Sequence, residues 1–210
     1  MPKIVDHDRR RAEIARVTMR VIQKVGLEKT TIRTIAREGG FTTGVLSHYF
    51  RDKDDIISFA FQWVADRDFA EIESAAAGLS PGLPRLRVSL DRMLLDPEAP
   101  EGAAVSLSFW SAAVGNPRLV VGYQENYSRW RSYVKRYLRE ALREGQVPGS
   151  VVIDDAVDLL VSAVDGLCVA MILDPSRFPK RRRRALIERL LVGVTESAST
   201  AVSRPVNLSA

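Results

Sequence analysis

Two short runs of helical periodicity, separated by a pair of glycines, constrain the amino-terminal quarter of this chain more than any other feature. Both runs lie between Thr30 and Ile57, where apolar residues recur at helical spacing. Gly39 and Gly40 lie between the runs, where a helix can end through a left-handed or tightly packed backbone, and Thr42 stands at the next N-cap. This order predicts a helix-turn-helix, whose second helix enters the major groove of DNA.

The side chains of this segment suit DNA. Gly44, at the opening of the second helix, has no side chain to keep a base edge or a phosphate away. Hydroxyl, imidazole, phenol and ammonium groups follow within two turns, as contacts to phosphates and base edges require. We therefore predict DNA contacts by the following residues: Thr30, Thr31, Arg33, Thr42, Thr43, Gly44, Val45, Ser47, His48, Tyr49 and Lys53.

The positive charge of the chain is concentrated at the same end. Residues 1–50 contain ten Lys and Arg against five Asp and Glu, a net charge of +5, and the whole chain contains 31 against 26, also +5. The remaining 160 residues are therefore neutral overall. This basic amino-terminal region, called the head below, indicates a polyanionic partner such as double-stranded DNA. The alternative is an ordinary solvated basic surface.

The rest of the sequence shows helical periodicity and almost no strand alternation, so we predict an all-α fold. Proline- and glycine-rich segments at 80–84 and 96–102 interrupt the helices. We expect an N-terminal three-helix helix-turn-helix DNA-binding domain, a C-terminal helical ligand-binding and dimerisation domain, and a disordered tail. Their predicted bounds are 1–53, 54–200 and 201–210. The predicted helices run from about 8–25, 54–76, 83–95, 103–114, 118–144, 154–173 and 179–198, besides the two short ones of the head.

Catalytic and metal chemistry find little support. The one cysteine, Cys168, allows no internal disulfide, and with only His7 and His48 there is no set of zinc ligands. No nucleophile with an adjacent base and no carboxylate pair is visible, so a small helical enzyme is a remote alternative, and we expect no catalytic residue, no cofactor and no metal. Without an uncharged apolar stretch of about 18 residues or a leader, we expect a cytoplasmic protein with no membrane partner.

The last two predicted helices indicate a homodimer. The helix at 154–173 is apolar on nearly all sides, and the helix at 179–198 has an apolar stripe. Two such helices would expose much apolar surface in a monomer, so we predict a two-fold dimer joined by a four-helix bundle. The alternative is that both helices are buried in the bundle of their own chain. The predicted interface comprises Leu160, Val164, Leu167, Met171, Leu186, Ile187, Leu190, Leu191 and Val194.

Aromatic residues gather in the middle of the chain, and Asp165 is the one acid deep inside the apolar helix. A buried carboxylate is costly unless it is paired, and aromatic rings attract cations, so this group would suit a small organic cation. The alternatives are that the rings are ordinary core residues and that Asp165 is structural. The predicted ligand-binding residues are Trp63, Phe109, Trp110, Tyr123, Tyr127, Trp130, Asp165 and Cys168.

Three segments resemble the TetR family of bacterial transcriptional regulators. These are GFTTGVLSHYFRDKDDII at 40–57, SFWSAAVGNPRL at 108–119 and DGL at 165–167. They are most similar to the subgroup that includes the choline-responsive repressors of betaine synthesis. The match is dense over 9–57, patchy over 105–130 and again near 165, and absent in the tail.

The resemblance implies a repressor that binds a palindromic operator as a homodimer and is released by a small-molecule effector. A regulator that binds DNA constitutively, without sensing a ligand, stays open as an alternative. The resemblance further implies phosphate contacts by Thr30 and Thr31 at the first helix and base contacts by Thr43 and Gly44 at the start of the second. It also implies that Ser47 and His48 face the groove and that Tyr49 and Lys53 bind phosphates at the end of the second helix.

Overall fold

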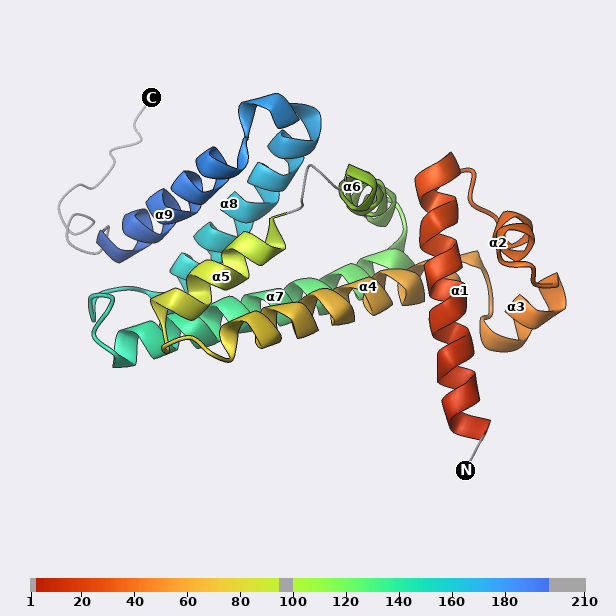
Figure 1. The fold of residues 1–210 in the computed structure, drawn as a ribbon, viewed down its shortest axis with the longest axis horizontal. Helices are drawn as coiled ribbons and strands as arrows, with labels where there is room; N and C mark the ends of the chain where they lie inside the picture. The colour runs from red at the N-terminus through yellow and green to blue at the C-terminus, as the bar shows by residue number, and fades with distance from the viewer. Residues whose placement is uncertain (1–2, 95–99, 197–210) are drawn as a thin grey trace, which may run out of the picture. The chain divides into compact units, whose positions relative to one another are not determined.

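The computed structural model describes residues 3–94 and 100–196 (Figure 1). Within these residues the chain forms nine α-helices, one short 3-10 helix and no strand, so the prediction of an all-α fold is confirmed. The tail predicted at 201–210 lies outside the described residues. The elements are α1 (Lys3–Val25), α2 (Ile32–Gly39), α3 (Thr43–Tyr49), α4 (Lys53–Ala76), α5 (Leu83–Met93), α6 (Pro100–Val114), α7 (Pro117–Arg143), α8 (Ile153–Leu173), η1 (Pro175–Arg177) and α9 (Lys180–Glu196).

These helices group into two compact units. Unit 1 comprises residues 1–70 and 95–128, and unit 2 comprises residues 71–94 and 129–210. The domain boundary predicted after residue 53 falls inside unit 1 because the first turns of α4 pack on the preceding helices. Ile56 is buried with residues of α1, α2 and α3, so the structural unit continues past the helix-turn-helix.

In unit 1, α1 is buried on two sides. One side packs against α2 and α3 and forms the core of the head, and the other packs against α4, α6 and the start of α7. A helix that serves two cores must carry apolar residues around much of its circumference. The core of the head contains Ile14, Val17, Val21, Ile35, Ala36, Leu46, Phe50 and Ile56. The second core contains Ile22, Leu27, Ile57, Phe61, Val105, Phe109, Ala113 and Leu119.

In unit 2, α7 and α8 run antiparallel, as their ion pairs show. Lys135 Nζ lies 2.5 Å from Asp154 Oδ1, and one turn earlier in α7 Arg131 pairs with Asp158, one turn later in α8. A bidentate pair between Arg87 of α5 and Glu188 joins α5 to α9. These charges border a core of buried side chains from α5, α7, α8 and α9.

By length and composition alone, α8 is apolar enough to cross a membrane, with a mean hydropathy of 2.1. A buried helix of a globular protein has the same composition. The carboxylates of Asp154 and Asp158 are paired with cations of α7, and residues such as Leu160 and Val161 are buried inside unit 2. We therefore describe α8 as a core helix.

Candidate nucleic-acid interface

Hydrogen bonds at the helix ends fix the helix-turn-helix. At the start of α2, Thr31 Oγ1 accepts from Thr34 N at 3.1 Å and Thr34 Oγ1 accepts from Thr31 N at 2.8 Å, which satisfies two amides that lack helical partners. The helix ends at Gly40, whose φ of +67° is a left-handed conformation that favours glycine. Thr42 Oγ1 then accepts from Val45 N at 3.2 Å and caps α3. The predicted turn at Gly40 and the predicted cap at Thr42 are confirmed.

The helix α3 has one buried side and one free side. Leu46 is fully buried in the head, whereas Thr43, Gly44, Ser47 and His48 are exposed. A Cβ atom added at Gly44 would meet no atom closer than Thr42 Oγ1, at 3.8 Å. The packing of the protein therefore does not require glycine here, and the missing side chain leaves room for a molecule that approaches from outside.

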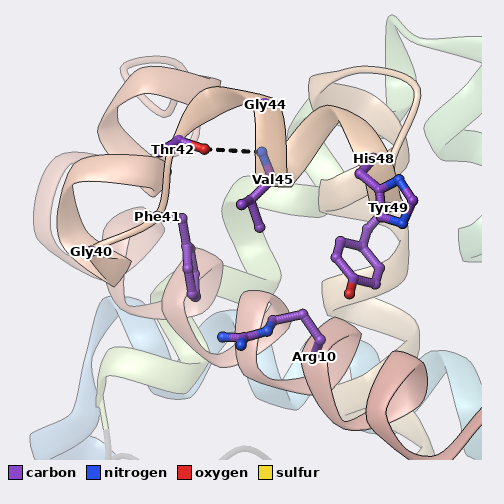
Figure 2. Close-up of a pocket in the computed structure, with 8 residues that line it drawn as sticks. All are labelled: Arg10, Gly40, Phe41, Thr42, Gly44, Val45, His48 and Tyr49. Atoms are coloured by element: carbon purple, nitrogen blue, oxygen red, sulfur yellow. Dashed lines mark hydrogen bonds between the residues drawn. The ribbon is translucent and has the colours of Figure 1, made fainter. Parts of the chain in front are cut away.

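A groove of about 620 Å³ lies between α1 and α3 (Figure 2). Arg10 of α1 forms one wall, Gly40, Phe41 and Thr42 form one end, and α3 forms the other wall. In Figure 2 the Arg10 guanidinium extends beneath the Phe41 ring, and its Cζ lies 5.8 Å from the ring centroid. One guanidinium nitrogen also donates to Glu13 Oε2 at 2.8 Å. The groove thus combines apolar rings with a cation beside the free side of α3.

Two residues of α1 in this region were not predicted as DNA contacts from the sequence. Arg10 lines the groove, and the ring of His7 lies 4.7 Å from the ring of Tyr49. The neighbouring Arg11 has a different role because its guanidinium lies over the ring of Phe50, a core residue, at 4.9 Å. A usable signal was present: extending the buried stripe of α1 back by four residues from Ile14 reaches Arg10.

Two predicted DNA contacts are already engaged within the head. Thr30 is fully buried, and its hydroxyl donates to the Gly26 carbonyl at 2.8 Å, so it holds the loop after α1 and does not face a phosphate. Lys53 Nζ donates to the Leu27 carbonyl at 3.1 Å and ties the start of α4 to the same loop. Thr30 is therefore corrected to a structural residue, whereas Lys53 stays a predicted contact that would exchange this bond for a phosphate.

The remaining predicted DNA contacts lie on the surface of the head. Thr31 and Arg33 are exposed at the start of α2, and Val45 and Tyr49 are half-buried in the groove wall.

Five of the predicted ligand-binding residues lie in unit 1. The Trp63 ring lies below the guanidinium of Arg16, at 5.6 Å, and Phe109 is buried and stacks on Phe61 with centroids 3.8 Å apart. Trp110 and Tyr123 pack against the same core. Tyr127 stacks on Tyr123 at 5.6 Å. Several of these rings are thus already occupied by packing within the protein.

The other three predicted ligand-binding residues lie in unit 2. Burial raises the pKa of Asp165 to about 6, and among the described residues no cation is paired with its carboxylate. Trp130 is buried, and its Nε1 finds no acceptor among the described side chains and backbone. Cys168 is buried, with its Sγ 3.6 Å from the Met93 carbonyl oxygen. Within the described part of the chain, Asp165 therefore has an unpaired carboxylate and Trp130 an unsatisfied indole N–H, whereas Cys168 is a packed core residue.

The predicted dimer residues divide between the core and the surface of unit 2. Buried within the chain are Leu160, Val164, Met171, Ile187 and Leu191, whereas Leu167, Leu186, Leu190 and Val194 are partly exposed. The buried five are unavailable to a second copy, so their assignment to the interface is corrected. On α8 and α9 the most exposed large apolar side chains are instead Leu159, 65% exposed, Leu173, 74%, and Val192, 48%.

Comparison with known proteins decides the family. Residues 84–195 match the family model described as BetI-type transcriptional repressor, C-terminal, and residues 14–58 match the model for bacterial regulatory proteins of the tetR family. The chain belongs to the TetR family. The resemblance seen in the sequence is confirmed, and the family consists of regulators of transcription rather than enzymes.

Relatives cover nearly the whole TetR-family chain. The HTH-type transcriptional regulator PksA of Bacillus subtilis is 31% identical over 189 residues, 89% of this chain and 90% of PksA. The regulator BetI of Yersinia pestis is 25% identical over 91% of this chain and 95% of BetI. A crystal structure of a transcriptional regulator from Saccharomonospora viridis in complex with choline has a TM-score of 0.77 at 20% identity, over 88% of this chain and 96% of that one. These matches place the two-part helical fold and DNA-binding regulation on the whole chain.

Proposed function

We propose that the protein is a homodimeric repressor that binds a palindromic operator and is released by a small organic cation. The observation that carries the DNA-binding part is the free side of α3 beside the cationic groove. Thr43, Gly44, Ser47 and His48 are exposed, and Arg10 supplies a positive charge next to this side of the helix. A helix of this kind reads base edges in the major groove while cations around it bind phosphates.

Exposed apolar side chains of α8 and α9 support the homodimer. Leu159 and Leu173 lie on one face of α8, where Gly166 and Ser162 between them allow a close approach of another helix. Val192 is exposed on α9. A second copy that packed its own α8 and α9 on this face would bury these side chains in a four-helix bundle. We therefore place the dimer contact on this outward face.

Asp165 and Trp130 support a cationic effector. A half-buried carboxylate without a paired cation is stabilised when a cationic ligand approaches it. The buried indole N–H of Trp130, in the same unit, also has no acceptor among the described residues, so it is a second polar group that a ligand would satisfy. The structural neighbour from Saccharomonospora viridis was crystallised with choline, a cation that carries a hydroxyl group. The aromatic residues of unit 1 stay predicted ligand contacts.

Selection of bound duplexes from a random library would test the operator. We expect recovery of palindromic sequences whose half-sites are one or more helical turns apart, because a two-fold dimer presents two α3 helices. Mass measurement of the complex should give an even number of protomers for each duplex. Recovery of no preferred sequence, or of a preferred half-site bound by one protomer, would contradict the proposal.

Choline would test the effector, with 3,3-dimethyl-1-butanol as a control of the same shape without the charge. We expect choline to weaken operator binding and the neutral control to have little effect. The effect should decrease below about pH 6, because a protonated Asp165 no longer attracts the cation. If no organic cation releases the operator, the alternative of a constitutive regulator is favoured. Since its target is bacterial DNA, we place the protein in the cytoplasm, with no membrane partner.

A further inference from the structure

Two turns of unit 1 that lie far apart in the sequence are joined by charge-assisted hydrogen bonds. One turn links α3 to α4, and the other links α6 to α7. Arg118 Nη1 donates to Asp52 Oδ2 at 2.6 Å, and Arg118 Nη2 donates to Asp54 Oδ2 at 2.8 Å. Asn116 Nδ2 donates to the same oxygen of Asp54 at 2.9 Å. Hydrogen bonds between ionised groups are shorter and stronger than neutral ones, so this network fastens one turn to the other.

Two members of the network also cap helices. Asp52 Oδ1 accepts from Asp55 N at 3.1 Å in the first turn of α4, while Asp52 Oδ2 accepts from Arg118. Asn116 Oδ1 accepts from Arg118 N at 3.0 Å at the start of α7, while its Nδ2 donates to Asp54. Because each cap residue bonds its own helix and the other turn, neither turn can move away without loosening the start of a helix.

The position of Arg118 is unfavourable for its own helix. It lies in the first turn of α7, where the helix dipole repels cations. Its hydrogen bond lowers the pKa of the Asp52 carboxyl below the usual range, and Asp52 in turn raises the pKa of Arg118. The helix α7 alone does not favour an arginine at this position. The hydrogen bonds to the carboxylates of Asp52 and Asp54 therefore explain why an arginine stands there.

We infer that Arg118 is a positioning residue for operator binding. Phe50 caps the end of α3, and its ring is buried in the core of the head. Asp52 lies two residues after Phe50. A turn fixed at this point restricts the movement of α3, so less conformational entropy is lost when α3 enters the groove of DNA. This inference rests on the proposed function, and it adds a residue outside the matched helix-turn-helix region to those that set operator affinity.

The test compares Arg118→Gln with the wild type on two duplexes of equal length, a selected operator and a scrambled sequence. We expect Arg118→Gln to weaken operator binding by about three- to fivefold, the size of a partly exposed ion pair. Binding to the scrambled duplex and the salt dependence of operator binding should stay unchanged, because Arg118 is not expected to touch a phosphate. Arg118→Lys should restore part of the affinity through one carboxylate.

Arg143→Gln is the matched control, since it removes the same charge from the other end of α7. Asp54→Asn combined with Arg118→Gln should cost less than the sum of the two single changes, because both remove the bond between Arg118 and Asp54. Operator binding by Arg118→Gln equal to that of the wild type would overturn the inference, as would an equal loss on both duplexes with a smaller salt dependence. If Arg118→Gln does not fold, Arg118→Lys decides by the same comparison. A wild-type protein that prefers no duplex would refute the proposed function before any variant is compared.

Discussion

Replacing Asp165 with asparagine should stabilise the protein near neutral pH. The carboxyl of Asp165 is half-buried and, among the described residues, unpaired, and burial raises its pKa from 3.8 to about 6. A difference of this size corresponds to about 3 kcal/mol between the ionised and neutral forms. Because the side chain is partly exposed, water reduces this cost, and we expect Asp165→Asn to raise the free energy of unfolding by about 1–2 kcal/mol at pH 7.5.

The sign of the pH dependence follows from the raised pKa. The folded protein binds a proton at Asp165 more tightly than the unfolded chain does, so this residue favours folding below about pH 4 and loses that contribution as the pH rises through about 6. The wild type should therefore lose stability between pH 4 and pH 6 relative to Asp165→Asn. Above that range the difference between the two proteins should be constant.

Urea unfolding followed by circular dichroism at several pH values would measure both effects. Asp154→Asn is the matched control in the same helix, since the carboxylate of Asp154 is bonded to Lys135, which lowers its pKa. This control should not stabilise the protein. If Asp165→Asn destabilises the protein at pH 7.5, the carboxylate has a partner within the folded chain, and the argument for a cationic ligand loses its basis.

Three further predictions concern the head and the dimer. Gly44→Ala should leave thermal stability unchanged or slightly higher, because its Cβ meets only Thr42 Oγ1, at an ordinary van der Waals distance, yet it should weaken operator binding in a mobility-shift assay. Thr42→Ala should lower the free energy of unfolding by about 1 kcal/mol through loss of the α3 cap, as measured by thermal unfolding. Leu159→Glu should dissociate the dimer in sedimentation experiments while the protomer stays folded, whereas Leu160→Glu should unfold the protomer, since Leu160 is fully buried. A stable dimer of Leu159→Glu would place the contact elsewhere.

The helix positions could be predicted because their ends are determined by local chemistry. Gly26 and Gly40 both adopt positive φ angles directly after a helix, and Pro117 begins α7, where a missing amide hydrogen costs nothing. Such signals need no knowledge of the tertiary structure. The helix-turn-helix of the head could also be predicted, because α3 has an apolar side that is buried and a polar side that is exposed.

The direction in which α8 faces could not be predicted. Leu159 and Leu160 are both apolar, yet one is 65% exposed and the other fully buried. A helix that is apolar on all sides has no polar stripe to mark the surface, so its orientation depends on packing against α7 and α9. Thr30 illustrates the same limit: its sequence context suits a cap that faces DNA, but its hydroxyl is used by the Gly26 carbonyl.

The dependence of operator affinity on salt concentration tests the central claim most directly. If the free side of α3 lies in the major groove, with cations such as Arg10 beside phosphates, raising the salt from about 50 to 200 mM should weaken binding by about a thousandfold or more. Arg10→Gln should make this dependence less steep. An affinity that stays constant over the same range would mean that the head does not bind DNA through this surface.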